Sequence, residues 1–128
     1  VAAALINAKD EVLLAKRPQG KMLAGYYEFP GGKVEPSETP EGALTRELHE
    51  ELGIEASAHD FAPLTFLSHG YSEFHLMMPV YTCRRWVGSP QALEHEDLAW
   101  ARPADMHKLL MIEVDFVLVE KLKEVLGG

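Results

Sequence analysis

The stretch 31–54 constrains the fold more than any other part of the chain, because it predicts an amphipathic helix with identifiable ends. Thr39 can cap the N-terminus, and Pro40 suits the first helical position, where a missing N–H costs nothing. Gly53 stands where a left-handed residue commonly ends a helix. Between these ends, apolar residues recur at helical spacing: Ala43, Leu44, Leu48 and Leu52. The helix must bury this stripe against another layer of structure.

The same helix carries a cluster of carboxylates. Three glutamates at spacings i, i+3 and i+4 share one face: Glu47, Glu50 and Glu51. Glu is a good helix former, so one interpretation is a solvated acidic surface. Against it, like charges at this spacing destabilise a helix, and only Arg46 and Lys33 are close in sequence to offset them. A Gly31-Gly32 turn can also bring a backbone carbonyl near these carboxylates. Such oxygen ligands suit Mg²⁺, so we predict a divalent metal site.

The spacing of this stretch resembles the signature of the Nudix hydrolases. That signature runs Gly, five residues, Glu, seven residues, then Arg-Glu-apolar-x-Glu-Glu-x-Gly-apolar. Every specified position is met: Gly32, Glu38, Arg46, Glu47, Leu48, Glu50, Glu51, Gly53 and Ile54. The resemblance implies hydrolysis of a nucleoside diphosphate linked to another moiety, with Mg²⁺ as the cofactor and Mn²⁺ as a substitute.

The resemblance also implies roles for individual residues. The expected catalytic residues are Glu47, Arg46 and Glu50: Glu47 as the base that activates water, and Arg46 as an orienting residue that pairs with a carboxylate such as Glu38. The expected metal ligands are the Gly31 carbonyl and the carboxylates of Glu47, Glu50, Glu51 and Glu94. Glu94 belongs to a loop that reads Glu94-His95-Glu96, where the family often has Glu-Gly-Gln. Whether Glu94 or Glu96 faces the site therefore stays open, and a solvated loop acid is the simpler alternative.

Substrate-binding residues follow from similarity to MutT-like members of the family. The segment 28–33 matches the Glu-Phe-Pro-Gly-Gly-Lys that precedes the signature in those proteins. The expected contacts to the nucleotide are Arg17, Glu28, Phe29, Pro30, Gly31 and Asp115. Each has a plainer interpretation: Phe29 as a core aromatic, Arg17 as a loop cation, and Asp115 as the cap of the last helix.

Length and charge narrow the classes of partner. The 128 residues fit one domain, 1–128, and 47% hydrophobic with 25% charged residues indicates a globular chain. The net charge of −8 disfavours stable nucleic-acid or membrane partners. The single cysteine, Cys83, excludes an internal disulfide and favours a cytoplasmic location. We expect a monomer or weak homodimer. Because the chain begins at Val1 within a predicted strand, we also expect a trimmed N-terminus.

The remaining pattern predicts an α+β fold. Segments 1–6 and 11–16 are short and apolar, and we expect them to form a hairpin. Further strands are predicted at 61–68, 74–86 and 98–101, and a final amphipathic helix at 115–125. Strands and helices mix without a regular βαβ rhythm, which indicates a mixed sheet between helices. The resemblance implies the same: a Nudix-type α/β/α sandwich with a central mixed β-sheet.

The leading functional prediction is a Mg²⁺-dependent pyrophosphohydrolase of the MutT type. It would cleave a nucleoside triphosphate, such as the oxidised purine nucleotide 8-oxo-dGTP, to the monophosphate and pyrophosphate, in the service of nucleotide-pool sanitation and DNA repair. Another Nudix substrate, such as CTP, dCTP or ADP-ribose, is the alternative within the enzyme class. Alternatives outside it are a non-catalytic nucleotide-binding module and a module cut from a larger repair protein.

Overall fold

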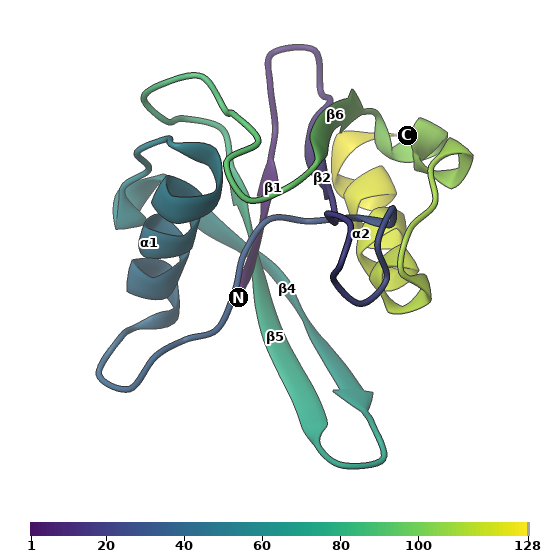
Figure 1. The fold of residues 1–128 in the computed structure, drawn as a ribbon. Helices are drawn as coiled ribbons and strands as arrows, with labels where there is room; N and C mark the ends of the chain where they lie inside the picture. Colours follow the sequence, from purple (N-terminus) through teal and green to yellow (C-terminus); the bar gives the residue numbers. More distant parts are fainter. Residues whose placement is uncertain (128) are drawn as a thin grey trace.

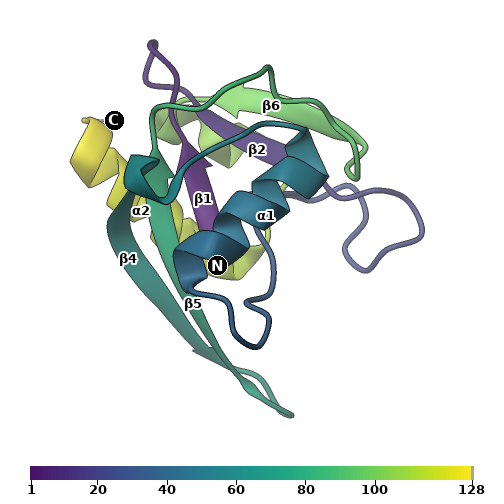
Figure 2. The ribbon, with the colours of Figure 1, turned by 90° about the vertical axis from the view of Figure 1, so that its left-hand side faces the viewer.

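The computed structural model describes residues 1–127 as a layer of β-strands between two helices (Figures 1 and 2). The helices and strands are β1 (Ala2–Leu5), β2 (Val12–Lys16), β3 (Tyr27–Glu28), α1 (Pro40–Leu52), β4 (Phe61–Gly70), β5 (His75–Cys83), β6 (Asp97–Ala101) and α2 (Phe116–Leu126). Three short 3₁₀ helices are η1 (Ala58–Asp60), η2 (Pro103–Lys108) and η3 (Glu113–Asp115). Helix α1 covers one face of the strands and α2 the other. The predicted α+β class and sandwich architecture are confirmed.

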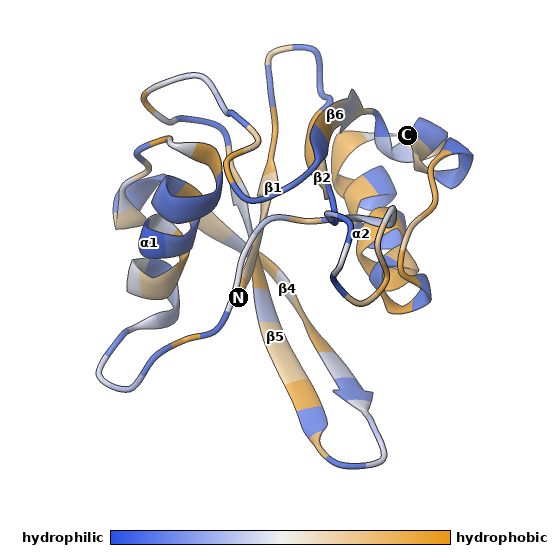
Figure 3. Ribbon diagram, viewed as in Figure 1, coloured by the Kyte–Doolittle hydropathy of each residue, from blue (hydrophilic) through white to orange (hydrophobic). Residues whose placement is uncertain are grey.

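Strand β1 explains why two helices are needed. Its successive side chains point to opposite faces, as in any strand. Ala3 packs in a core with Leu44 of α1, whereas Ala4 packs in a second core with Leu118 of α2. Because both faces are buried, the strand is apolar throughout rather than alternating. Figure 3 shows hydrophilic residues on the visible face of α1 and hydrophobic residues along the central strands.

The strands form two three-stranded sheets. One has the order β1-β5-β4, in which β1 runs parallel to β5 and β4 antiparallel to it. The other has the order β3-β2-β6 and is antiparallel. The prediction of a hairpin between segments 1–6 and 11–16 is wrong. A single bridge, Ile6 to Val12, joins the two segments. The two strands diverge there because β1 takes β5 as its ladder partner and β2 takes β3 and β6.

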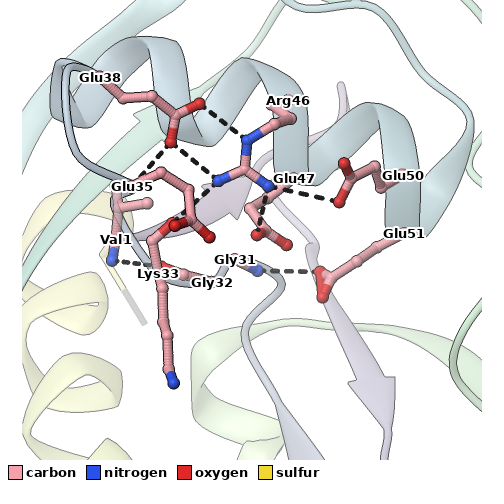
Figure 4. Close-up of polar contacts among 10 residues, drawn as sticks. All are labelled: Val1, Gly31, Gly32, Lys33, Glu35, Glu38, Arg46, Glu47, Glu50 and Glu51. Atoms are coloured by element: carbon pink, nitrogen blue, oxygen red, sulfur yellow. Dashed lines mark hydrogen bonds and ion pairs between the residues drawn. The ribbon is translucent and has the colours of Figure 1, made fainter.

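Helix α1 has the ends that the sequence predicts. The Thr39 side chain accepts a hydrogen bond from the Gly42 N–H at 3.0 Å. At the other end Gly53 has φ +72° and donates its N–H to the His49 carbonyl. All four residues of the predicted apolar stripe are buried: Ala43, Leu44, Leu48 and Leu52. The opposite, polar side of the helix is thereby fixed toward the loop that contains Gly31 and Gly32 (Figure 4).

Three further features concern helix α2, the β4–β5 ribbon and the length of the helices. Helix α2 begins at Phe116, one residue later than predicted, after the short helix η3. Strands β4 and β5 form a long ribbon that extends away from the helices. No helix within residues 1–127 has the length and apolar character that crossing a membrane requires.

Candidate active site

Arg46 is the centre of a polar network on the exposed face of α1 (Figure 4). Its Nε and Nη2 donate to the two carboxylate oxygens of Glu38 at 2.8 and 2.9 Å. Its Nη1 donates to Glu47 Oε1 at 2.9 Å and, more weakly, to Glu50 Oε2 at 3.4 Å. Nη2 also reaches the carbonyl of Lys33 at 3.0 Å. The predicted pairing of Arg46 with Glu38 is present, and the same guanidinium orients Glu47.

Glu51 is one turn further along α1 and is buried, with 8% of its surface exposed. Its Oε1 accepts a hydrogen bond from the Gly31 N–H at 3.1 Å. Burial, reinforced by the nearby carboxylates of Glu47 and Glu28, raises the pKa of Glu51 to about 7. Within residues 1–127 no Lys or Arg side chain forms an ion pair with it. A solvated acidic surface therefore does not describe this residue: its charge is withdrawn from water, and the charge of the nearby His95 only partly opposes the rise in its pKa.

The two glycines of the turn are required by close contacts. A Cβ at Gly32 would overlap the carboxylate of Glu47, so the glycine allows that side chain to lie against the backbone. A Cβ at Gly31, where φ is +155°, would overlap the Val1 carbonyl and the Ala2 backbone. The turn itself is held to the edge of β1 by the Gly32 N–H, which donates to the Val1 carbonyl at 3.0 Å. Glu47, Glu51 and the Gly31 backbone thus come together through contacts distant in sequence.

A cavity of about 750 Å³ opens beside this cluster. Three Lys or Arg residues line it, Arg17, Lys21 and Lys33, together with two histidines, His75 and His95. Three acidic residues also line it: Glu28, Glu51 and Glu94. Residues 75–79 of β5 form a further, largely apolar wall. A second cavity of similar volume lies across α1, beside Thr45, His49 and Trp86, and contains none of the predicted metal ligands.

The loop 91–97 contributes one predicted residue and one that the sequence interpretation missed. Glu94 lines the cavity, whereas Glu96 is not among its lining residues. His95 was not among the predicted site residues, yet its Nε2 lies 3.0 Å from Glu28 Oε2. The other oxygen of Glu28 accepts from Arg17 Nη1 at 2.9 Å. Burial opposes ionisation of Glu28, but the hydrogen bonds from His95 and Arg17 outweigh it and lower the pKa. The position of His95 directly after Glu94 was the available signal.

Other predicted substrate contacts differ in how they relate to the cavity. The Phe29 residue lines it, but its side chain is buried in the core beneath α2, so the core interpretation also holds. Pro30 does not line the cavity, and its carbonyl accepts from the Ala3 N–H.

Asp115 also lies outside the lining of the cavity, and it is buried at the start of α2 without a side-chain capping hydrogen bond. Burial, together with the charge of Glu28, raises the pKa of Asp115 to about 6. Asp115 therefore stands at the cap position of α2, but its side chain does not make the hydrogen bond of a helix cap.

The donor chemistry fits a hard divalent cation, although residues 1–127 contain no preassembled site. Among residues 1–127, no three His, Cys, Asp or Glu side chains are grouped closely enough to hold a metal ion. The candidate donors are nevertheless all oxygens: the carboxylates of Glu47, Glu50, Glu51 and Glu94 and the Gly31 carbonyl. Mg²⁺ prefers such ligands and commonly retains waters and substrate phosphates in its remaining positions. The buried charge of Glu51 is where a cation would be most stabilising.

Known proteins of one family resemble this chain along most of its length. The family model of the NUDIX domain matches residues 1–121. A CTP pyrophosphohydrolase of Escherichia coli (strain K12) is 38% identical over 120 residues, which cover 94% of this chain and 87% of that protein. An 8-oxo-dGTP diphosphatase of the same organism is 34% identical over 94 residues, covering 73% and 71%. The crystal structure of a MutT NUDIX hydrolase from Burkholderia pseudomallei superposes with a TM-score of 0.81 at 30% identity, covering 94% of this chain and 93% of that one.

Proposed function

The chain belongs to the Nudix family and is a Nudix hydrolase, and from that premise we propose that it is a nucleoside triphosphate pyrophosphohydrolase. It would convert a nucleoside triphosphate to the monophosphate and pyrophosphate. The observation that carries this proposal is a cavity lined by three cations, with the buried carboxylate of Glu51 at its wall. Lys21, Lys33 and Arg17 offset the charge of a triphosphate, which a protein of net charge −8 would otherwise repel.

Nudix hydrolases generally use a divalent metal, and we propose Mg²⁺ here, with Mn²⁺ as a substitute. Glu47, Glu50, Glu51 and Glu94 would hold it, together with the Gly31 carbonyl. When bound, such a cation polarises phosphoryl oxygens and lowers the pKa of water. The absence of a hydrogen bond from any residue in 1–127 to the second oxygen of Glu51 leaves that atom available.

The chain's own residues supply orientation and proton transfer. Arg46 holds Glu47 through Oε1, and the other carboxylate oxygen, which accepts no hydrogen bond from residues 1–127, can accept the proton of an attacking water. Glu38 holds Arg46 in turn through both of its oxygens. The basic residues of the cavity stabilise the negative charge that develops on the departing pyrophosphate.

For the base, we propose an oxidised purine as the first candidate, as in 8-oxo-dGTP. Arg17 and Glu28, which line the cavity, and the buried Asp115, which lies outside its lining, would supply the polar groups. A buried carboxyl with a pKa near 6 can exist with or without its proton near neutral pH, so Asp115 can donate to or accept from a base edge. CTP or dCTP is the second candidate, because the relative that covers 94% of this chain is named a CTP pyrophosphohydrolase.

The test is pyrophosphate release across a panel of substrates with Mg²⁺: dGTP, 8-oxo-dGTP, dCTP, CTP and ADP-ribose. We expect hydrolysis to stop in EDTA and to return with Mg²⁺ or Mn²⁺. The highest kcat/KM for 8-oxo-dGTP would support sanitation of oxidised nucleotides. The highest value for CTP or dCTP would favour the second candidate, and hydrolysis of ADP-ribose alone would contradict the proposal.

The proposal also includes the cellular setting. We propose a cytoplasmic enzyme that acts on free nucleotides as one domain, 1–128, without a stable nucleic-acid partner. A monomer or weak homodimer is expected, and light scattering of the purified protein across a concentration series would measure this. The strongly negative charge supports the absence of a nucleic-acid partner.

A further inference from the structure

The loop that carries His95 is held on both sides by backbone hydrogen bonds. At the α1 side, the Gln91 N–H donates to the Leu52 carbonyl at 2.9 Å and the Leu93 N–H to the Glu51 carbonyl at 3.1 Å. At the sheet side, the Glu96 N–H donates to the Lys16 carbonyl at 2.9 Å, directly before Arg17. The backbone of His95 is thereby fixed between the helix and β2.

The His95 imidazole is buried, with only 6% of its side chain exposed. Its Nε2 lies 3.0 Å from Glu28 Oε2, and because a carboxylate accepts, Nε2 is the donor. Its Nδ1 is the one buried side-chain nitrogen or oxygen within residues 1–127 that has no hydrogen-bond partner. Buried polar atoms are nearly always paired, so an unpaired one calls for an explanation. In this orientation of the imidazole, Nε2 has a hydrogen-bond partner and Nδ1 has none.

His95, Glu28 and Arg17 all line the cavity, and Glu28 connects the other two. Glu28 uses its second oxygen to accept from Arg17 Nη1 at 2.9 Å. Arg17 Nε is bound in turn to the Met22 carbonyl at 2.7 Å. Three side chains therefore form a chain of contacts, His95 to Glu28 to Arg17, of which only Glu28 and Arg17 were expected at the substrate.

We propose that His95 is a positioning residue for nucleotide binding: its Nε2–H fixes the carboxylate of Glu28, which in turn holds Arg17 at the cavity wall. Without this hydrogen bond Glu28 can rotate, and Arg17 then keeps the Met22 carbonyl but loses the carboxylate that fixes its Nη1. The expected consequence is weaker nucleotide binding with little change in the chemical step, because Glu47 and Arg46 are not part of this chain of contacts. This inference rests on the proposed function, since the ligand is a nucleotide.

Two substitutions separate this role from that of a simple core histidine. A Gln side chain can present an amide N–H near the position of Nε2, whereas the shorter Asn presents one near Nδ1. The experiment compares His95→Gln with His95→Asn, and uses His59→Asn, an exposed histidine of η1, as the control. One readout is the affinity for the nucleoside monophosphates dGMP and CMP by calorimetry in EDTA. The other is KM and kcat with Mg²⁺.

We expect His95→Asn to weaken monophosphate binding and raise KM by about tenfold, the effect of losing a hydrogen bond to a charged group. The kcat should change by less than about twofold. His95→Gln should recover most of the affinity, and His59→Asn should match the wild type. Equal affinities for the Gln and Asn variants would overturn the inference, as would a loss confined to kcat.

A wild type that hydrolyses nothing on the panel would overturn the proposed function, yet the monophosphate titration would still decide the role of His95. Should His95→Asn fail to fold, as judged by circular dichroism, nuclear magnetic resonance of the wild type provides the test. Addition of the monophosphate should shift the side-chain ¹⁵N resonances of His95 and leave those of His59 unchanged. Unshifted His95 resonances would overturn the proposal.

Discussion

Both carboxylate oxygens of Glu38 accept hydrogen bonds from the guanidinium of Arg46, at 2.8 and 2.9 Å. This bidentate pair ties the loop before α1 to the face of the helix that carries the glutamate cluster (Figure 4). The hydrogen bonds from Arg46 lower the pKa of Glu38 to about 2, so the carboxylate stays ionised across the physiological range. Because the same guanidinium contacts Glu47, the position of the loop also fixes the orientation of the proposed catalytic base.

Arg46→Lys should lower kcat by about 10- to 100-fold with a smaller change in KM. A lysine has a single ammonium group in place of the planar fork, so it would lose the simultaneous contacts to Glu38, Glu47 and the Lys33 carbonyl. Steady-state kinetics with Mg²⁺ would measure this. Arg84→Lys, at an exposed ion pair with Asp10, is the control and should be silent. Wild-type kcat in Arg46→Lys would show that the network does not orient the base.

Glu47→Gln and Glu51→Gln should each lower turnover by about 100-fold or more while the fold persists. Each substitution keeps the shape of the side chain but removes a carboxylate that would bind metal or accept a proton. Initial rates with Mg²⁺, together with circular dichroism, would measure both effects. Glu120→Gln, an exposed position on α2, is the matched control. Full Mg²⁺-dependent activity in Glu51→Gln would contradict its assignment as a metal ligand.

Gly32→Ala should mainly lower activity, whereas Gly31→Ala should mainly lower the stability of the fold. At Gly32 the new Cβ meets the flexible Glu47 carboxylate, so the protein should fold but lose activity as Glu47 is displaced. At Gly31 the new Cβ meets backbone atoms of Val1 and Ala2, so the cost should fall on stability, by about 2 kcal/mol or more. Urea unfolding and kinetics measured on both variants would separate the two. Similar loss of stability in both would contradict the prediction.

Asp115→Asn should stabilise the protein in a pH-dependent way. Burial raises the pKa of Asp115 from its ordinary 3.8 to about 6, so ionising it costs the folded state free energy. This penalty is absent below pH 3.8 and fully present above about pH 6, where it amounts to at most about 3 kcal/mol. The gain in the free energy of unfolding should therefore be small at pH 4 and large at pH 7. Chemical denaturation at both pH values measures it, with the exposed Asp105→Asn as the control. A gain independent of pH would argue against the raised pKa.

Asp115→Ala should lower the discrimination among bases more than it lowers turnover of the best substrate. A polar group that pairs with one base rejects another by leaving partners unpaired. The ratio of kcat/KM between 8-oxo-dGTP, dGTP and CTP would measure this. An unchanged ranking would assign Asp115 to the structure of the α2 N-terminus rather than to base recognition.

Local sequence spacing was sufficient for α1. Its cap at Thr39, its end at Gly53 and its buried leucines all depend on residues within one or two turns of each other, which the sequence displays directly. The same spacing was sufficient to place Glu47 and Glu51 on a common side of the helix, although it could not predict that Glu51 is buried whereas Glu50 is largely exposed. That difference depends on which neighbours cover the helix face.

The hairpin expected from segments 1–6 and 11–16 shows that local sequence patterns do not predict which strands pair. Two apolar segments joined by a short turn are compatible with pairing, and one bridge does form. The competing partners are distant in sequence: β1 pairs with β5, and β2 pairs with β6. Strand pairing is decided by the burial of whole strands in the assembled fold, which local patterns do not contain.

The sequence by itself determined the helix, the cluster of carboxylates that it carries and the family to which the chain belongs, because these depend on residues at short, fixed spacings. Only the tertiary structure decided that His95 meets Glu28, 67 residues earlier in the chain. It also decided that the Asp115 carboxyl, buried at the start of α2, lies close enough to Glu28 for the charge to raise its pKa. The first contact arises because β2 pairs with both β3 and β6, which brings the loop before β6 beside Glu28. The second arises because Tyr27 of β3 bridges to Met111, a few residues before Asp115. Such alignment depends on long-range hydrogen bonding and shared burial, so it appears only once the chain is folded.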